Sequence, residues 1–259
     1  MRDPELPYQG LQTLLRRDYA VTMGALLFVI AVCWAYLLAG AGMTMPDMSS
    51  DQMLRPVWDT PYALLMLAMW WVMMVAMMLP SAAPMILMFS KVSRESTDDG
   101  AGAVAAFIAA YIVAWGGFSL AATALQWALD AAGWMSPHMA STNQVFGGCL
   151  LIAAGAWQLT PLKHACLRHC RSPFAYFMHQ WRDGVQGAFR MGFGHGAYCL
   201  GCCWVLMALL FYGGVMNLWW ILGLTLYVLI EKIVPAGHWV GRGTGGLLVI
   251  WGAVVLLGA

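Results

Sequence analysis

Charged residues are scarce in this 259-residue sequence: 13 lysines and arginines and 12 aspartates and glutamates make up only 10% of the chain. A soluble domain usually carries about 25% charged residues, which supply much of its hydrated surface. Because 61% of the residues are hydrophobic, the chain has too few polar groups to cover a globule of its size. The formal net charge of +1 gives no electrostatic support for a nucleic-acid partner. The composition therefore predicts an all-α, polytopic membrane helix bundle whose first partner is the lipid bilayer.

Long polar segments are also lacking, so the chain is expected to form a single integral membrane domain over residues 1–259. A spanning helix needs about 20 mostly apolar residues. Seven segments approach this length: 20–40, 62–80, 103–128, 143–160, 186–212, 216–232 and 244–259. The first ends without a small-residue cleavage site, so we interpret it as a retained span rather than a signal peptide. We expect about seven transmembrane helices, of which the last two are the shortest.

Basic residues are distributed unevenly between the two sides that seven spans define. If the N-terminus is cytoplasmic, every lysine and arginine except Arg55 lies in or beside a cytoplasmic segment. The positive-inside rule therefore predicts a cytoplasmic N-terminus.

The seven cysteines do not form the pattern of a secreted disulfide framework. Two groups stand out, Cys166 with Cys170 and Cys199 with Cys202 and Cys203, whereas Cys33 and Cys149 stand alone. Tight cysteine groups with histidine nearby are typical of metal or redox sites.

The segment "HGAYCLGCCW" places His195, Cys199 and Cys202 or Cys203 on one face of a predicted helix. A buried thiol is often only a small apolar group. A thiolate in lipid, by contrast, needs a cation beside it, which a bound metal ion supplies. Adjacent Cys202 and Cys203 cannot both face one partner unless the helix is irregular, which Gly201 would permit.

Methionine is frequent, with 20 in the chain and eight between Met66 and Met88. Two M-x-x-x-M pairs interlock there, Met73 with Met77 and Met74 with Met78, and each pair shares one helix face. Thioethers favour Cu(I), although methionine also serves as a flexible apolar packing residue. At about 1.5 Å per residue, Met73 and Met77 lie at the same depth as Cys199 and Cys203, which predicts that the two groups face each other.

Pro80 and Pro84 follow these pairs, and each removes a backbone donor. They predict either a structural hinge or a functional opening in the second span. Before this span, the polar loop "MTMPDMSSDQM" carries Met43, Met45 and Met48. These methionines either capture a soft ion or fold onto the membrane interface.

The loop segment "TPLKHACLRHCRSP" holds His164, Cys166, His169 and Cys170. A Cys₂His₂ set suits zinc, and a pair of thiolates suits Cu(I). The basic residues of the same segment are equally typical of a cytoplasmic loop on anionic lipid.

The segment "LIEKIVPAGH" places Glu231 and Lys232 at the end of the sixth span. Ionisable residues in a membrane are functional candidates, but an interfacial pair can also snorkel to the surface. The glycines of "GRGTGG" at 241–246 have no preceding strand, so they are not a dinucleotide loop. They favour a turn and a close approach between helices.

Four motifs together resemble a known family: "MMVAMMLPSAAPM", "LTPLKHACLRHCRSP", "GHGAYCLGCCWVLM" and "LIEKIVPAG". Over residues 58–240 the chain is similar to bacterial predicted metal-binding integral membrane proteins of unknown function. The resemblance implies a multi-pass protein of the bacterial inner (cytoplasmic) membrane and a bound metal, but neither the ion nor the activity.

Three functions are consistent with these features, and a binding or transport role is favoured over an enzymatic one. The first is Cu(I) transport, or Cu(I) delivery with a copper chaperone or a membrane cuproenzyme as partner. The second is a membrane thiol–disulfide oxidoreductase, because Cys199 and Cys202 form a C-x-x-C spacing. The third is a structural or assembly subunit of a homo- or hetero-oligomeric membrane complex.

Overall fold

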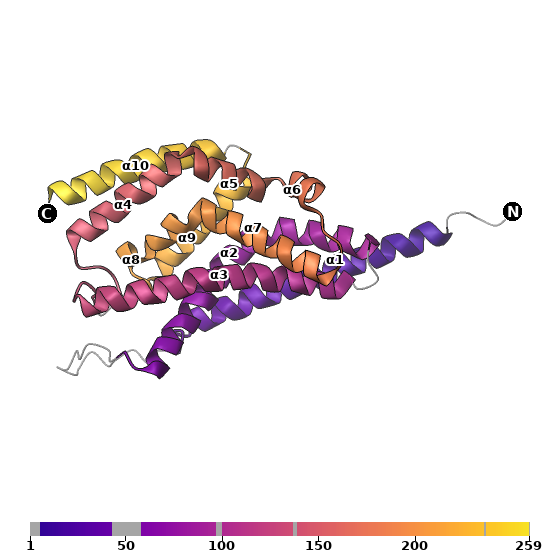
Figure 1. The fold of residues 1–259 in the computed structure, drawn as a ribbon, viewed down its shortest axis with the longest axis horizontal. Helices are drawn as coiled ribbons and strands as arrows, with labels where there is room; N and C mark the ends of the chain where they lie inside the picture. The colour runs from indigo at the N-terminus through magenta and orange to yellow at the C-terminus, as the bar shows by residue number, and fades with distance from the viewer. Residues whose placement is uncertain (1–5, 43–57, 97–99, 137–138, 236, 259) are drawn as a thin grey trace.

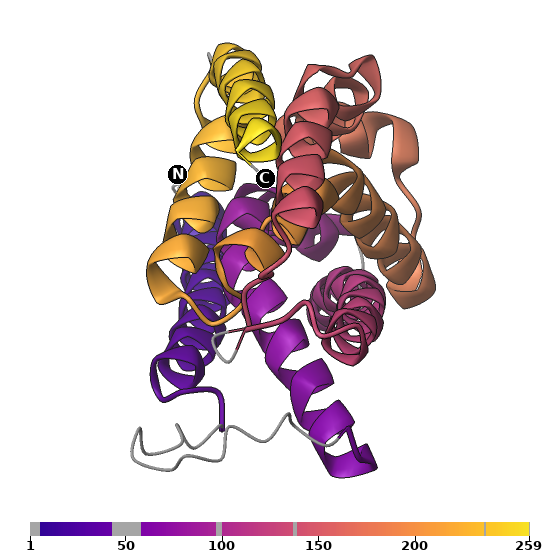
Figure 2. The same cartoon turned by 90° about the vertical axis from the view of Figure 1, so that its left-hand side faces the viewer.

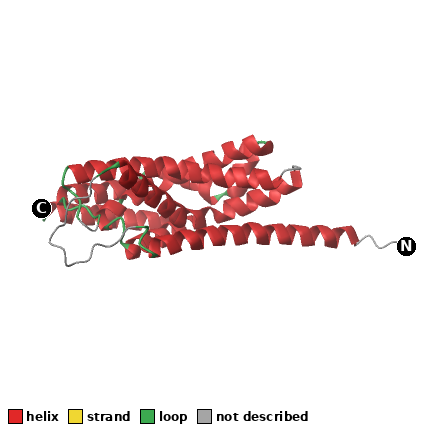
Figure 3. Cartoon of the chain, turned by 90° about the horizontal axis from the view of Figure 1, so that it is seen from below, coloured by secondary structure: helices red, strands yellow, loops and turns green. Residues whose placement is uncertain are grey.

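A computed structural model describes residues 6–42, 58–96, 100–136, 139–235 and 237–258. In these residues the secondary structure is helical, with no strand, which confirms the all-α prediction (Figure 3). The helices are α1 (Leu6–Leu38), α2 (Thr60–Ser96), α3 (Gly100–Ala131), α4 (Gln144–Leu159), α5 (Pro161–Arg171), α6 (Pro173–Gln180), α7 (Gly184–Ala208), α8 (Leu210–Gly213), α9 (Leu218–Ile233) and α10 (Gly237–Leu257).

Five helical stretches are long and apolar enough to cross a membrane. They are Tyr19–Leu38, Thr60–Ser93, Gly100–Ala131, Gly184–Gly213 and Trp239–Leu257. A sixth arises if α4 and α5, which meet at an angle of 65°, count as one bent span. The sixth predicted segment, 216–232, corresponds to α9, whose 16 residues are too few for this test. The structure therefore supports five or six spans among the described residues rather than seven.

The second span extends beyond its predicted end at residue 80. Helix α2 continues through Pro80 and Pro84 to Ser96. Hydroxyl groups of Ser81 and Tyr111 donate hydrogen bonds to the carbonyl of Met78 beside the first proline. Prolines are tolerated in apolar helices when neighbouring side chains and helices support the backbone around them.

The helices form an elongated bundle in which α7 lies between α3 and α5 (Figures 1 and 2). Helices α1, α2 and α3 lie on one side, and the pair α4 and α10 lies on the other. Helix α7 packs along α3, and α5 crosses back onto α7. The start of α1 and the end of α10 lie at opposite ends of the long axis.

Local capping sequences explain where several helices begin. The side chains of Asn143, Thr160 and Asn217 accept hydrogen bonds from the first turns of α4, α5 and α9. Thr160 also precedes Pro161, and a residue before proline disfavours helical backbone. The chain therefore leaves α4 at Thr160 and starts α5 in a new direction.

Glycines bring α4 and α10 into close contact. A Cβ atom added to Gly155 would lie 2.5 Å from the carbonyl oxygen of Gly245, and one added to Gly252 would lie 2.7 Å from that of Gly148. Gly245 belongs to the "GRGTGG" segment, so the predicted close approach is confirmed. The predicted turn is wrong, because the whole segment lies inside α10.

We expect Gly155→Ala to destabilise the protein by about 1–3 kcal/mol, because the added methyl group would overpack the contact between α4 and α10. Thermal unfolding of the detergent-solubilised chain measures the effect. Gly223→Ala is the matched control, since nothing lies within 4 Å of a Cβ atom at that helical position. Equal melting temperatures for the two variants would contradict the prediction.

A buried cysteine cluster as the candidate metal site

Five of the seven cysteines meet where α5 crosses α7. The side chain of Cys170 on α5 lies beside those of Cys199 and Cys202 on α7. Cys166, one turn earlier on α5, packs against the backbone of α7 at Gly201. The sequence separates these residues into a loop group and a span group, but the fold joins them into one cysteine cluster: Cys166, Cys170, Cys199, Cys202 and Cys203.

The adjacent residues Cys202 and Cys203 contact different neighbours. The Cys203 sulfur lies 3.9 Å from the Met78 sulfur on α2, whereas Cys202 faces the α5 cysteines. Both thiols donate to the carbonyl of Cys199, at 3.1 and 2.9 Å, as residues one turn later on a regular helix can. The irregular helix that the adjacent cysteines suggested is therefore not needed.

Gly201 has another role in this arrangement. A Cβ atom at position 201 would lie 2.8 Å from the sulfur of Cys166. The missing side chain thus allows α5 to approach α7 closely enough for the cysteines of both helices to meet.

Helix α2 contributes a methionine sulfur to the cluster. Met73, Met74, Met77 and Met78 are all fully buried. The contact to a cysteine sulfur is made by Met78. The depth estimate is right to within one residue, but it cannot tell which face of α2 is turned toward α7.

Lys232 is the cationic neighbour of the cluster. Its ammonium group donates to the Cys199 sulfur at 2.9 Å and to the Ser81 hydroxyl at 3.0 Å. The hydroxyl of Tyr111 lies 3.2 Å from the same sulfur. Cys199 therefore has one charged and one neutral polar neighbour inside the bundle, and an adjacent ammonium group stabilises a thiolate.

A buried ion pair lies next to Lys232. Lys163 on α5 and Glu231 on α9 form an ion pair of 2.5 Å, with side-chain exposures of 0% and 3%. Gly241 on α10 leaves room for it, since a Cβ atom there would lie 2.5 Å from the Glu231 carboxylate oxygen. Both residues of the predicted interfacial pair, Glu231 and Lys232, are buried, so the snorkelling interpretation is wrong.

His195 lies one turn before Cys199 and is only 2% exposed. Its ring stacks on Tyr111 and Phe107, with centroid distances of 5.5 and 6.3 Å. Neither ring nitrogen has a hydrogen-bond partner among the described residues. A buried imidazole without partners is costly, so this side chain fits a site that receives a ligand.

Tyr176 on α6 forms another wall beside His195, with ring centroids 6.0 Å apart. Burial raises the pKa of the Tyr176 hydroxyl. The neutral hydroxyl donates to the carbonyl of Met191 at 2.7 Å, which anchors α6 to α7.

The predicted zinc set at 164–170 does not converge on one point. His169 makes a hydrogen bond to the carbonyl of Ala165 and stacks on Tyr198, with centroids 4.2 Å apart. Throughout the described ranges, no group of three or more His, Cys, Asp and Glu side chains could hold a metal ion. Such a group is what a structural zinc site requires, whereas two sulfurs suffice for Cu(I).

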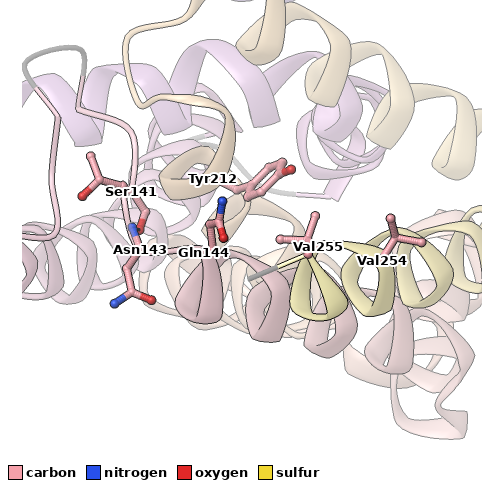
Figure 4. Close-up of a pocket in the computed structure, with 9 residues that line it drawn as sticks. Ser141, Asn143, Gln144, Tyr212, Val254 and Val255 are labelled. Carbon is pink, nitrogen blue, oxygen red and sulfur yellow. Dashed lines mark hydrogen bonds between the residues drawn. The ribbon is translucent and has the colours of Figure 1, made fainter.

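Two other features stand apart from the cysteine cluster. The loop methionines Met43, Met45 and Met48 lie outside the described residues. A pocket of about 310 Å³ opens near the start of α4, between Tyr212 and the end of α10 (Figure 4). Its lining residues, among them Asn143 and Gln144, include no sulfur atom and no charged group, so it offers nothing to a soft metal ion.

Sequence reasoning missed Tyr111 and Ser81, and it gave Lys232 no role beside the thiols. Tyr111 belongs to no motif, and Ser81 lies inside the methionine motif without a role of its own there. Only the packing of the helices brings Tyr111 to Cys199 and Ser81 to Lys232. The spacing of Cys166 and Cys170 shows that both lie on one helix face. The sequence signal that α5 turns back onto α7 is the helix break at Thr160 and Pro161, because the chain changes direction there.

The described residues therefore place this chain in the class of helical proteins that bury a sulfur-rich site among apolar helices. The particular family follows from comparison: residues 67–255 match the family model PpoB2, described as a copper chaperone. The chain belongs to this family, and its function is therefore related to copper. No curated protein and no solved structure matches the chain significantly. The matched range includes every residue of the cysteine cluster.

The buried ion pair yields a stability prediction. Glu231→Gln leaves the Lys163 ammonium buried without a counter-charge, and we expect a loss of about 3–5 kcal/mol in unfolding free energy. The double variant Lys163→Met/Glu231→Leu removes both charges and should recover most of that loss. Unfolding midpoints in detergent measure both effects. A double variant no more stable than the single one would show that the pair is not the source of the effect.

Proposed function

We propose that this protein is a membrane-embedded Cu(I) carrier that holds the ion in its cysteine cluster and delivers it to a membrane cuproenzyme. The observation that carries the proposal is the meeting of Cys170 with Cys199 and Cys202 from a separate helix, inside an apolar bundle. Membership of a copper chaperone family supports copper as the cargo.

The donor set supports Cu(I) in particular. Thiolate and thioether sulfurs are soft ligands that select Cu(I) over hard cations. Cys170 and Cys199 supply a pair of thiolates from two helices, and Met78 adds a thioether beside Cys203. A carrier must also release its cargo, and the neighbouring cysteine sulfurs offer alternative ligands through which the ion can be exchanged.

Charge balance supports a pair of thiolates. One Cu(I) ion with two thiolates carries one net negative charge, which an apolar interior cannot hold alone. The Lys232 ammonium, 2.9 Å from the Cys199 sulfur, supplies one positive charge. Lys163 is neutralised by Glu231, so it does not alter this balance. His195 adds a buried imidazole that can support the ion from one turn away on α7.

The cellular setting follows from the sequence. We propose a multi-pass protein of the bacterial inner membrane with a cytoplasmic N-terminus, formed as one domain. In this orientation α5, which carries Cys166 and Cys170 together with Arg168 and Arg171, lies toward the cytoplasmic end of the bundle. The ion then passes between the cytoplasmic half of the bundle and a partner, either a copper chaperone or a cuproenzyme.

The oxidoreductase alternative is less well supported by the geometry. Cys199 and Cys202 are at most 1% exposed, so a protein disulfide would not reach them without opening the bundle. Both Cys202 and Cys203 donate to the Cys199 carbonyl rather than pointing outward.

The first test removes the thiolate pair. The chain in lipid nanodiscs should bind about one Cu(I) ion tightly, with a sulfur-only first shell in X-ray absorption spectra. Cys170→Ser/Cys199→Ser should abolish tight binding, because an alcohol is a poor ligand for a soft ion.

Cys33→Ser/Cys149→Ser is the matched control, since it also removes two thiols, both outside the cluster. The control should bind Cu(I) as the unmodified chain does. Tight binding that survives in Cys170→Ser/Cys199→Ser would refute the site. A mixed disulfide trapped with a partner protein, without copper binding, would favour the oxidoreductase instead.

The second test addresses Lys232. We expect Lys232→Met to weaken Cu(I) binding by about 10–100-fold, the range typical of groups that support metal ligands without touching the metal. Lys232→Arg keeps the charge and should retain most of the affinity. Competition titrations against a Cu(I) chelator measure both variants. Equal affinities for the Met and Arg variants would mean that charge compensation does not matter.

A further inference from the structure

Two methionine sulfurs lie beside one buried amide nitrogen, well away from the cysteine cluster. The amide nitrogen of Gln126 on α3 lies 3.6 Å from the sulfur of Met66 on α2 and 3.7 Å from that of Met139 in the loop before α4. Residues 66 and 139 are distant in sequence, so the fold alone brings both thioethers beside one amide group.

Trp70 fixes the direction of this amide group. Its indole nitrogen donates to the Gln126 carbonyl oxygen at 2.7 Å, so the amide nitrogen must face the sulfurs. Gln126 is 1% exposed. A thioether is a weak acceptor, so two of them satisfy a buried amide poorly. The weak hydrogen bonds from the Gln126 amide therefore do not explain why two thioether sulfurs lie here.

The backbone at Met139 is held in an uncommon conformation. Its φ angle of 55° is in the left-handed region, which is unusual for a residue other than glycine. The Met139 amide donates to the Ser136 carbonyl at 2.9 Å, and the Met139 carbonyl accepts from the Val215 amide at 3.2 Å. Strained positions that the surrounding structure keeps in place tend to occur at functional sites.

The methionines of α2 connect the two regions. Met66, Met73 and Met77 are fully buried and recur at helical spacing on one face of α2. Met78, which contacts Cys203, lies 12 residues after Met66, or about 18 Å along the helix axis. Thioethers thus occur at intervals along the way from Met139 to the cysteine cluster.

We propose that Met66 and Met139 form a second, weaker binding site for a soft monovalent cation, Cu(I) or Ag(I), from which the ion passes along α2 to the cysteines. Met139 is partly exposed and Met66 is buried, so the pair leads from the surface inward. In the proposed orientation this site lies at the outer end of the bundle. The transfer to the cysteines rests on the proposed function, whereas binding at the pair does not.

The experiment titrates the full chain in nanodiscs with Ag(I), a probe that stays monovalent, and counts tight and weak bound ions. Met66→Leu/Met139→Leu should lose the weak class, with a drop of about tenfold or more in its affinity, and keep the tight one. Methionine-to-leucine changes conserve volume, so the variant should fold. Met85→Leu is the control, because it removes a thioether that is equally buried at the other end of α2.

The cysteine variant separates this proposal from the previous one. Cys170→Ser/Cys199→Ser should lose the tight class and keep the weak class. If Met66→Leu/Met139→Leu binds Ag(I) exactly as Met85→Leu does, the second site is refuted while the cysteine site stands. If the cysteine variant keeps its tight class, the cysteine site fails instead. Ag(I) transfer to the tight class should also be slower in the methionine variant, and an unchanged rate would refute the route along α2.

Discussion

The burial of Lys232 is the constraint on which the arrangement of the site depends. An ammonium group in an apolar bundle is costly unless a partner of opposite charge or strong hydrogen-bond acceptors surround it. In the part of the chain that the structure describes, no carboxylate pairs with Lys232. Its partners are the Cys199 sulfur and the Ser81 hydroxyl, on α7 and α2. A thiolate at Cys199 is therefore the natural counter-charge. The hydrogen bonds of the Lys232 ammonium group join α9 to both α2 and α7.

Small residues make these contacts reachable. On α7, a Cβ atom at Gly196 would lie 2.6 Å from the Ala114 side chain of α3, so only glycine allows the two helices to pack at this distance. That approach brings the Tyr111 hydroxyl to the Cys199 sulfur. Gly201 does the same on the opposite side of α7, where it admits Cys166. The polar and sulfur groups of the site thus depend on positions that carry no side chain.

The two sulfur sites differ in a way that suits transfer in one direction. The pair Met66 and Met139 is neutral and lies beside the neutral amide of Gln126. The cysteine cluster can ionise and has an ammonium group beside it. A monovalent cation is held more strongly by thiolates than by thioethers, so the difference in ligand charge would draw the ion from the first site to the second.

Much of the fold could be predicted from the sequence. The scarcity of charge and the long apolar runs determined a helical bundle, and helical spacing determined which sulfurs share a face, as for Cys199 and Cys203. The count of spans was less accurate, because length alone cannot distinguish the bent pair α4 and α5 or the short α9 from full crossings.

Only the tertiary structure decided which faces meet. Spacing along one helix says nothing about the rotation of that helix against another, so the contact between Met78 and Cys203 could not be read from either helix alone. The 65° bend between α4 and α5 likewise decides that Cys170 joins Cys199. The sequence by itself determined the chemistry of the ligands and their order along each helix. Packing between distant helices decided their grouping, because contacts between remote segments depend on the whole bundle rather than on any local pattern.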